Sequence, residues 1–335
     1  MKISFTGAPE YMDRHVGYGE ASFHIFEQFK KNNVECVIKD KTANIGISFI
    51  QPDQFTFGKD QYKIGYTPWE STGIPWSWEN PINNVVDELW TTSQWCADIF
   101  KKYTDKPIFI YEHGVQESWT PVKRTKPKNR PFRFLHIGEP AYRKDAQAVV
   151  NAFTEIFGDD PNYELVLKCS RMSTVKIFDK ETGEVKGSPS AIYDNIKMIE
   201  GFLTVSQMNA LYDMCDVFVY PSWGEGFGFN PLQAMAKAIP TICTSGWATY
   251  AEYITAPLQS KLNVSPWQEI HPGDMLKPNY NQLKNYMIDI TKDYESYADI
   301  AYTNSFLVHK RYAWDEVTAP AIKRLKEIEK SYFKA

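Results

Sequence analysis

The residues best suited to chemistry lie in the stretch 216–240, which reads DVFVYPSWGEGFGFNPLQAMAKAIP. Its pattern predicts a short apolar strand, a loop punctuated by glycines, and a helix that begins at Asn230 with Pro231 in the first helical position. Glu225 stands in the middle of the loop. The glycines leave backbone amides uncovered beside a helix N-terminus, where an anion is stabilised. We therefore expect a polar ligand here, with Glu225 accepting hydrogen bonds from its hydroxyl groups.

A pair of cations forms the second candidate group. Arg143 and Lys144 lie in FLHIGEPAYRKDAQAVVNAF, directly before a helix expected to start at Asp145. Cations at a helix N-terminus oppose the helix dipole. An anionic ligand held between these side chains and the helix end would relieve that conflict. The alternative is a pair of solvated charges that reach away into water.

Gln233 admits two interpretations. It follows Asn230 by three residues, which matches a capping box, and it could equally face a ligand. Gly17 and Gly19 form another glycine loop ahead of a predicted helix, but a lone Gly-x-Gly is as consistent with a simple turn. Further along the chain, Ser206 is expected to cap a helix.

Strands alternate with helices through both halves of the chain, which predicts an α/β protein with parallel, doubly wound sheets. We expect a first domain over residues 1–120, a linker over 121–131, a second domain over 132–310, and an amphipathic helix within 311–335, interrupted or started at Pro320. The expected strands cover residues 3–6, 34–38, 45–50, 63–67, 88–92, 108–111, 132–137, 165–169, 196–199, 217–220 and 241–243.

The composition excludes several classes of protein. A hydrophobic content of 43% over 335 residues supports folded cores, and a net charge of −4 argues against a dedicated nucleic-acid coat. The five cysteines form no CxxC pair and mostly accompany apolar runs, which favours reduced thiols in the cytoplasm. No apolar run is long enough to span a bilayer, and the six histidines lack metal-ligand spacing, so no metal site is expected.

The linker carries a basic run without an intervening acid. Such a run is usually a solvated connection between domains. Near the mouth of a cleft it could instead meet a polyanionic acceptor such as DNA. Its members are Lys123, Arg124, Lys126, Lys128, Arg130 and Arg133.

The segment EGFGFNPLQAMAKAIPTI resembles the signature of retaining glycosyltransferases of family 4, which have the GT-B fold of two Rossmann-like domains facing across a cleft. That signature has Glu, seven residues, and Glu; here it has Glu225, seven residues, and Gln233. The resemblance implies that Glu225 binds hydroxyls of the donor sugar. It places Gln233 where a carboxylate grips the ribose, although Gln brings no charge. In this fold the C-terminal helix is expected to pack back on the N-terminal domain.

A second matching element is the segment around the two cations. Family members usually have Gly-Arg after the strand and a Lys a few residues later, and both cations hold the diphosphate. Lys144 falls on the Lys position, Glu139 occupies the Arg position, and Arg143 is the obvious substitute. The resemblance thus assigns Glu225, Arg143 and Lys144 to catalysis. It assigns to donor binding Gly17, Gly19, Gly226, Phe227, Gly228 and Gln233.

The acceptor side departs most from the family. The loop YTPWESTGIPW lacks the His that family members often carry there, so Glu70 with Trp69 and Trp76 are the candidates for acceptor contacts. His15, beside the first glycine pair, is another. The alternative is an aromatic loop packed against its own domain.

The resemblance implies transfer of a sugar from a nucleoside-diphosphate sugar, as co-substrate, to an acceptor hydroxyl, with retention at the anomeric carbon and without cofactor or metal. Acceptors in this class include glycans, small molecules and modified nucleic-acid bases. One alternative is a non-catalytic relative that binds a nucleotide sugar or glycan, because Glu139 and Gln233 depart from the pattern. A nicotinamide-dependent oxidoreductase would need Gly-x-Gly-x-x-Gly directly after a strand, which the sequence does not contain.

Overall fold

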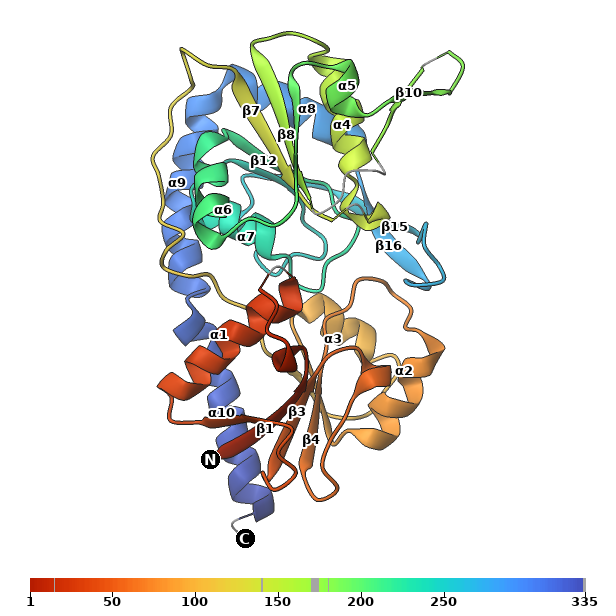
Figure 1. Ribbon diagram of the computed structural model, residues 1–335, viewed down its shortest axis with the longest axis vertical. Coiled ribbons are helices and arrows are strands. Elements are labelled where there is room, and N and C mark those ends of the chain that lie inside the picture. Colours follow the sequence, from red (N-terminus) through yellow and green to blue (C-terminus); the bar gives the residue numbers. More distant parts are fainter. Residues whose placement is uncertain (15, 140, 170–174, 180, 334–335) are drawn as a thin grey trace.

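The computed structural model describes residues 1–333 except 15, 140, 170–174 and 180. The described chain forms two six-stranded parallel sheets, one above the other along the long axis of the molecule (Figure 1). Their strand orders are β2-β1-β3-β4-β5-β6 and β11-β8-β7-β12-β13-β14. Each sheet reverses its winding direction at an inner strand, as doubly wound sheets do. The predicted α/β architecture of two Rossmann-like domains is confirmed.

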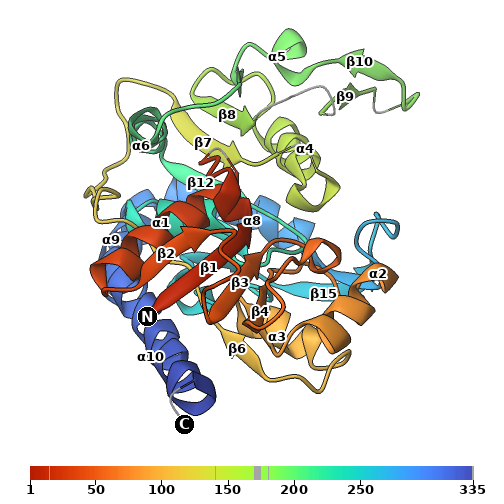
Figure 2. The ribbon, with the colours of Figure 1, turned by 60° about the horizontal axis from the view of Figure 1, so that its bottom comes forward.

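The first sheet follows the predicted order of elements. Its strands are β1 (Lys2–Gly7), β2 (Glu35–Ile38), β3 (Ile45–Phe49), β4 (Tyr62–Tyr66), β5 (Glu88–Thr91) and β6 (Ile108–Ile110). Its helices include α1 (Gly17–Lys31), α2 (Trp76–Asn80) and α3 (Gln94–Phe100). Consecutive residues of a strand point to opposite faces. Leu89 accordingly packs in the cluster under α2 and α3, and Trp90 in the cluster under α1, so both faces of the sheet are covered (Figure 2).

The second sheet is built in the same way. Its strands are β7 (Phe132–Ile137), β8 (Tyr163–Cys169), β11 (Ile196–Glu200), β12 (Val217–Tyr220), β13 (Thr241–Thr244) and β14 (Ala256–Leu258). Its helices include α4 (Ala146–Ile156), α5 (Pro189–Ile192), α6 (Val205–Met214), α7 (Phe229–Ala236) and α8 (Tyr280–Lys292). Val217 packs with α4 and α8, whereas its neighbour Phe218 packs with α6 and α7.

Two antiparallel hairpins extend from this half. One pairs β9 (Ile177–Phe178) with β10 (Val185–Gly187). The other pairs β15 (Ser260–Val264) with β16 (Asp274–Pro278) and was not predicted. Its Asp274 exchanges hydrogen bonds with Thr72 of the first half, at 2.8 Å in each direction. This hairpin therefore bridges the two sheets.

The C-terminal helices run along both halves of the molecule (Figure 1). Helix α9 (Tyr294–Arg311) packs on α7, and α10 (Trp314–Phe333) packs on α1 of the first half. Arg324 of α10 pairs with the buried carboxylate of Glu88, and Pro320 lies inside the continuous helix. Among the described residues, no helix has both the length and the apolar content needed to cross a membrane.

The predicted helix caps are wrong in two places. Helix α7 begins at Phe229, and its N-cap is Gly228 with a φ of 85°, so Asn230 caps nothing. The Asn230 amide instead donates to the carbonyl of Ile137 at 3.1 Å. The capping-box interpretation of Gln233 therefore fails. Helix α6 is capped by Thr204 rather than Ser206, because Thr204 accepts from the backbone N–H of Gln207.

Candidate active site

A cavity of about 420 Å³ lies between the carboxyl ends of the two sheets. Parallel strands bring loops of different sequence position to one edge, which is where α/β proteins bind ligands. The first half lines the cavity with Tyr18, Phe49, Glu70 and His113, among others. From the second half come Gly138, Arg143, Lys144, Lys168, Tyr220 and Glu225, among others. The cavity therefore joins both predicted groups of functional residues.

Glu225 is the centre of the polar network in this cavity. Its Oε1 accepts from Lys144 Nζ at 2.6 Å and from the hydroxyls of Ser222 at 2.7 Å and Tyr220 at 3.0 Å. Arg143 Nη1 lies 2.7 Å from the same oxygen. Glu225 is 4% exposed, so these are interactions inside the protein rather than on its surface. The structure thus brings together the three residues predicted to be catalytic.

The protonation states follow from burial and neighbouring charge. Burial would raise the pKa of Glu225, but the charges of Arg143 and Lys144 outweigh it and lower the pKa to about 2. Burial, assisted by the charge of Arg143 and opposed by that of Glu225, lowers the pKa of Lys144 to about 8. Burial would lower the pKa of Arg143, but the carboxylates of Glu225 and Glu70 raise it. Near neutral pH the carboxylate is ionised and both cations are charged.

Arg143 also reaches the opposite half of the molecule. Its Nη1 donates to the carbonyl of Gly224 at 2.9 Å, and its Nη2 lies 3.3 Å from Glu70 Oε1. The other oxygen of Glu70 lies 3.4 Å from His271 Nε2, in the loop of the bridging hairpin. Burial would raise the pKa of Glu70, but the charge of Arg143 and the contact with His271 lower it. Glu70 is thus an ionised partner of a predicted phosphate-binding cation.

The backbone before α4 fixes the direction of the two cations. Asp145 adopts a left-handed conformation with a φ of 53° and caps α4 by accepting from the N–H of Ala148 at 3.2 Å. It also accepts from Trp223 Nε1 at 2.9 Å and from the Tyr280 hydroxyl. The N–H of Trp223 donates to the carbonyl of Arg143 at 2.7 Å. These contacts tie the turn that carries the cations to the strand-β12 loop that carries Glu225.

The glycines of the Glu225 loop permit a close approach of the two halves. A Cβ on Gly224 would lie 2.3 Å from the carbonyl oxygen of Glu70, and one on Gly226 would lie 2.1 Å from Cβ of Pro68. Either contact would force the backbones apart. Thr92 donates to the carbonyl of Gly226 at 2.6 Å. The loop is therefore seated against the first half.

The remaining donor-side candidates also line the cavity, except Gly19. Gly17 begins α1, and Gly19 packs against the backbone of Asp13, where a Cβ would lie 1.9 Å from its carbonyl oxygen. Phe227, Gly228 and Gln233 lie along the cavity wall.

The wall is held together by aromatic and polar contacts. The ring of Phe227 lies 5.0 Å from that of His113. The amide oxygen of Gln233 lies 3.5 Å from the Tyr212 hydroxyl, a long contact that leaves the side chain at the cavity.

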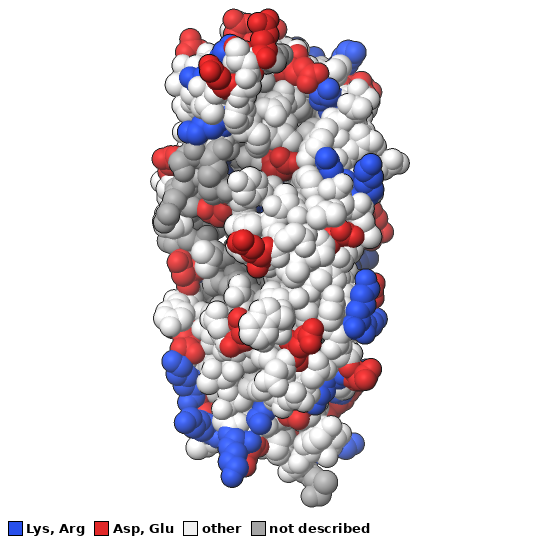
Figure 3. Space-filling model, turned by 90° about the vertical axis from the view of Figure 1, so that its right-hand side faces the viewer, with Lys and Arg blue, Asp and Glu red and all other residues white. Residues whose placement is uncertain are grey.

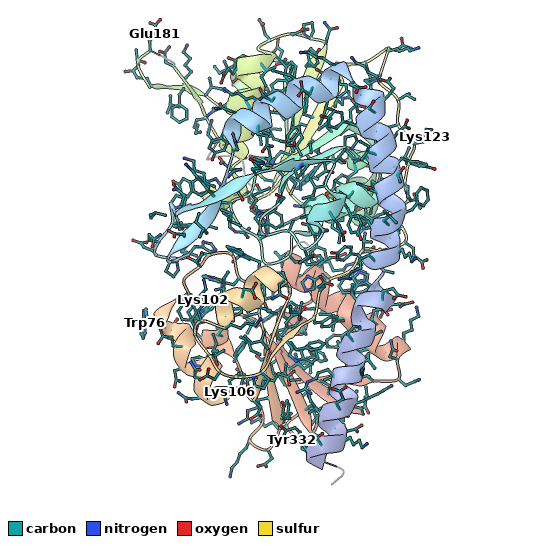
Figure 4. All side chains as sticks on the ribbon, turned by 180° about the vertical axis from the view of Figure 1, so that it is seen from behind. Trp76, Lys102, Lys106, Lys123, Glu181 and Tyr332 are labelled. Atoms are coloured by element: carbon teal, nitrogen blue, oxygen red, sulfur yellow. The ribbon has the colours of Figure 1, made fainter. Side chains whose placement is uncertain are left out.

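The acceptor-side candidates separate in the structure. Glu70 lines the cavity, whereas Trp69 is buried, packs on Trp78 at 4.4 Å and on His271 of the bridging hairpin at 5.1 Å, and donates Nε1–H to the carbonyl of Gly73. Trp76 is 88% exposed and points away from the molecule (Figure 4). His15 lies outside the described residues. Trp69 is thus packed between its own domain and the bridging hairpin and is not among the residues that line the cavity.

The basic run of the linker is largely paired with the second half. Arg124 is buried and donates to the carbonyl of Cys215 at 2.7 Å, and Arg130 pairs with Asp216 at 2.7 Å. Arg133 pairs with Glu164 at 2.7 Å. The linker lies at the left edge of Figure 1, and the opposite face, shown in Figure 3, carries interspersed basic and acidic side chains. The run therefore fastens the linker to the domain instead of forming one basic surface.

Several residues of the site were missed by the sequence prediction. Tyr220 and Ser222 bond Glu225, His271 contacts Glu70, and Lys168 lines the cavity from the end of β8. The position of Tyr220 and Lys168 at the carboxyl ends of strands was the available signal. Within the described part of the chain, no group of His, Cys, Asp and Glu side chains is placed to hold a metal ion.

Comparison with known proteins agrees with the geometry. The sequence of Escherichia coli serotype-specific mannosyltransferase WbdA is 50% identical over 42 residues, which cover 12% of this chain and 5% of that protein. The chain thus matches a small part of the length of this relative.

Solved structures show the same fold along nearly the whole chain. Sucrose-phosphate synthase from Thermosynechococcus elongatus superposes with a TM-score of 0.69 at 13% identity, covering 98% of this chain and 99% of that one. HepE from Anabaena, in complex with UDP-glucose, superposes with a TM-score of 0.62 at 12% identity, covering 98% and 100%. The fold is therefore that of the GT-B glycosyltransferases.

The sequence itself places the chain in a family. Residues 118–304, more than half of the 335 residues, match the family of glycosyl transferases group 1. This match includes Arg143, Lys144 and Glu225. The protein belongs to the glycosyl transferases group 1 family.

Proposed function

We propose that the protein is a retaining glycosyltransferase of family 4 that moves a sugar from a nucleoside-diphosphate sugar to an acceptor hydroxyl. The observation that carries this proposal is the buried carboxylate of Glu225, held by Arg143 and Lys144 at the wall of the interdomain cavity. Mannosyltransferase WbdA and the UDP-glucose complex of HepE lend it support. The first name points to transfer of mannose and the second title to a nucleotide sugar as ligand, and both are the chemistry to test.

The polar network suggests how a donor would be bound. Glu225 supplies the negative charge that both cations face. A diphosphate would compete for Arg143 and Lys144, because phosphate oxygens are strong acceptors for charged donors. The Glu225 carboxylate would then turn to the hydroxyls of the sugar. The backbone amides near Gly17, at the start of α1, and near Gly228 would add donors for the phosphate oxygens.

The same arrangement stabilises the transition state. When the bond between the anomeric carbon and the diphosphate breaks, negative charge grows on the leaving phosphate oxygen. Arg143 and Lys144 are already fixed by the protein, so they would stabilise this charge without reorganising. The acceptor oxygen bonds to the anomeric carbon on the face that the diphosphate leaves, and its proton passes to the leaving phosphate oxygen. The configuration is therefore retained without a protein nucleophile.

The two halves of the chain have different tasks in this proposal. Residues 132–310 bind the nucleotide sugar, and residues 1–120 present the acceptor, with Glu70 facing the cavity from that side. Residues 121–131 are the linker, and residues 311–335 tie the chain back to the first domain. The acceptor is a hydroxyl of a glycan, a small molecule or a modified nucleic-acid base.

Release of nucleoside diphosphate tests the proposal. The full chain is incubated with UDP-, GDP-, ADP- and CDP-linked sugars and with candidate acceptors, and both free nucleotide and the mass of the acceptor are measured. We expect release that depends on acceptor and is lowered at least about tenfold by Glu225→Ala. Glu181→Ala, at an exposed hairpin turn (Figure 4), is the matched control and should leave the rate unchanged. Full activity in a folded Glu225→Ala variant would refute the assignment.

A binding protein without turnover is the second candidate. It is favoured by Gln233 and Glu139, which replace a carboxylate and a cation of the family pattern and both line the cavity. Such a protein would bind a nucleotide sugar in calorimetry and release no nucleoside diphosphate with any acceptor. The release assay therefore separates the two functions.

A further inference from the structure

Lys168 is a cavity-lining cation that the proposed chemistry does not use. It lies near the end of β8 and is 7% exposed. Its Nζ donates to the carbonyls of Gly201 at 2.6 Å and Cys169 at 3.2 Å. An ammonium group carries three N–H donors, one more than these two carbonyls use.

The sheet places Lys168 at a defined separation from the phosphate-binding cations. Strand β8 pairs with β7, and β7 pairs with β12, which leads into the Glu225 loop. Strands lie about 4.8 Å apart, so two steps put Lys168 about 10 Å from the strand that leads to Glu225, the carboxylate that Arg143 and Lys144 contact. In a nucleoside diphosphate, the ribose and the inner phosphate separate the base from the outer phosphate. With the diphosphate at Arg143 and Lys144, a base held about this far away in the same cavity would reach the end of β8.

The surroundings of Lys168 suit a flat heterocycle. Ile137 is its register partner on β7, and Phe202 and Leu203 follow directly after Gly201. All three side chains line the cavity. An apolar wall covers the faces of a base, and a polar group at its edge then reads the exocyclic substituent. Lys168 is the cation at this edge.

We propose that Lys168 donates a hydrogen bond to the exocyclic carbonyl oxygen at the distal edge of the nucleobase, O4 of uracil or O6 of guanine, so that the protein selects these bases over cytosine or adenine, which carry an amino group at that position. An ammonium only donates and never accepts. The amino group of cytosine or adenine is also a donor, so it could not form a hydrogen bond with the Lys168 ammonium. Both groups would then be left unpaired in a largely buried site. This inference rests on the proposed function, because it takes the diphosphate to lie at Arg143 and Lys144.

Calorimetric titration of the full chain with UDP, CDP, GDP and ADP tests the proposal. The pairs UDP/CDP and GDP/ADP each exchange a carbonyl for an amino group at the distal edge of the ring. We expect the tightest ligand to be UDP or GDP, and its amino counterpart to have a Kd at least about tenfold higher. Whether UDP or GDP binds more tightly shows whether the preferred base is a pyrimidine or a purine.

Substitutions of Lys168 separate recognition from a structural role. Lys168→Met removes the donors and should bring the two Kd values of a pair to within about threefold of each other. Lys168→Gln carries an amide oxygen that accepts from an amino group, so it should shift the ratio toward CDP or ADP. Lys168→Arg keeps donors and should keep the preference. Thermal unfolding shows which variants are folded.

The outcomes distinguish this inference from the proposed function. Equal Kd values for the keto and amino members in the wild-type protein would overturn the role of Lys168 and leave the proposed function standing. An unchanged ratio in a folded Lys168→Met or Lys168→Gln variant would do the same. Failure of all four nucleotides to bind the folded wild-type protein would overturn both.

Discussion

Removal of the Lys144 ammonium is the sharpest single perturbation of the proposed active site. In Lys144→Ala the buried carboxylate of Glu225 keeps Arg143, Ser222 and Tyr220 as partners, at 2.7, 2.7 and 3.0 Å. No unpaired buried charge is created, so the fold should survive. The change instead removes one of the two cations that face the leaving diphosphate.

The magnitude follows from the interaction that is lost. A hydrogen bond to a charged group contributes about 1.5–3 kcal/mol. Each 1.4 kcal/mol of barrier is about tenfold in rate, so kcat/KM for the donor should fall between about tenfold and about a hundredfold. Because charge builds on the diphosphate in the transition state, most of the loss should fall on kcat rather than on KM.

Release of nucleoside diphosphate under saturating acceptor measures the effect. Lys102→Ala is the matched control, because Lys102 is exposed, follows α3 (Figure 4) and is not among the residues that line the cavity. Its kinetics should equal those of the wild type. Wild-type kcat/KM in a folded Lys144→Ala protein would show that this cation does not stabilise the leaving group.

Three further predictions concern the same site. The kcat/KM of the free enzyme should fall as pH rises through about 8, since the lowered pKa of Lys144 removes its charge there, and Lys144→Arg should move the fall to higher pH in a pH–rate profile. Between about pH 8 and the ordinary Lys pKa of 10.5, the folded protein binds fewer protons at Lys144 than the unfolded chain does, so this group makes the free energy of unfolding rise with pH within that window. Gln233→Glu should lower the KM for the donor at least about threefold in steady-state kinetics, because a carboxylate binds a hydroxyl more strongly than an amide does; an unchanged or higher KM would remove Gln233 from the nucleotide site. Gly226→Ala should lower the free energy of unfolding, measured by urea denaturation, by about 1–3 kcal/mol, because its Cβ would clash with Pro68. Gly17→Ala is the control, because a Cβ there would lie 4.0 Å from Phe229. A urea midpoint for Gly226→Ala no lower than that of Gly17→Ala would contradict the tight packing of the loop.

The sequence predicts the sheets because their signals are local. Short apolar strands bounded by glycine, proline and polar residues recur through both halves, and parallel pairing follows from their alternation with helices. Lys144 and Glu225 were each predicted to be functional because each lies shortly before a predicted helix. The resemblance to a family then assigned both to one site. Their meeting in space depends on the pairing of β7 with β12, which brings two strand ends side by side.

The interdomain contacts could not be predicted, because they depend on how the two halves dock. Glu70 was expected to face the acceptor; in the fold, where the β15–β16 hairpin bridges the sheets, its carboxylate pairs with Arg143 and His271. Arg130 donates to Asp216, which lies 86 residues further along the chain. A basic run that the sequence suggests is solvated therefore includes a side chain that forms an ion pair in the fold.

The prediction that Asn230 caps α7 was wrong for a similar reason. The left-handed Gly228 takes the cap position, and the folded protein offers Asn230 the carbonyl of Ile137 instead. Neither fact is visible in the spacing between Asn230 and Gln233.

The anomeric configuration of the first product tests the central claim most directly. The purified protein is supplied with an α-linked nucleotide sugar and its acceptor, and the coupling constant of the new anomeric proton is followed by NMR from the earliest time points. A product that is α-linked from its first appearance, formed with release of nucleoside diphosphate, is the predicted result. A β-linked first product would contradict retention, and nucleotide binding without any product would contradict transfer itself.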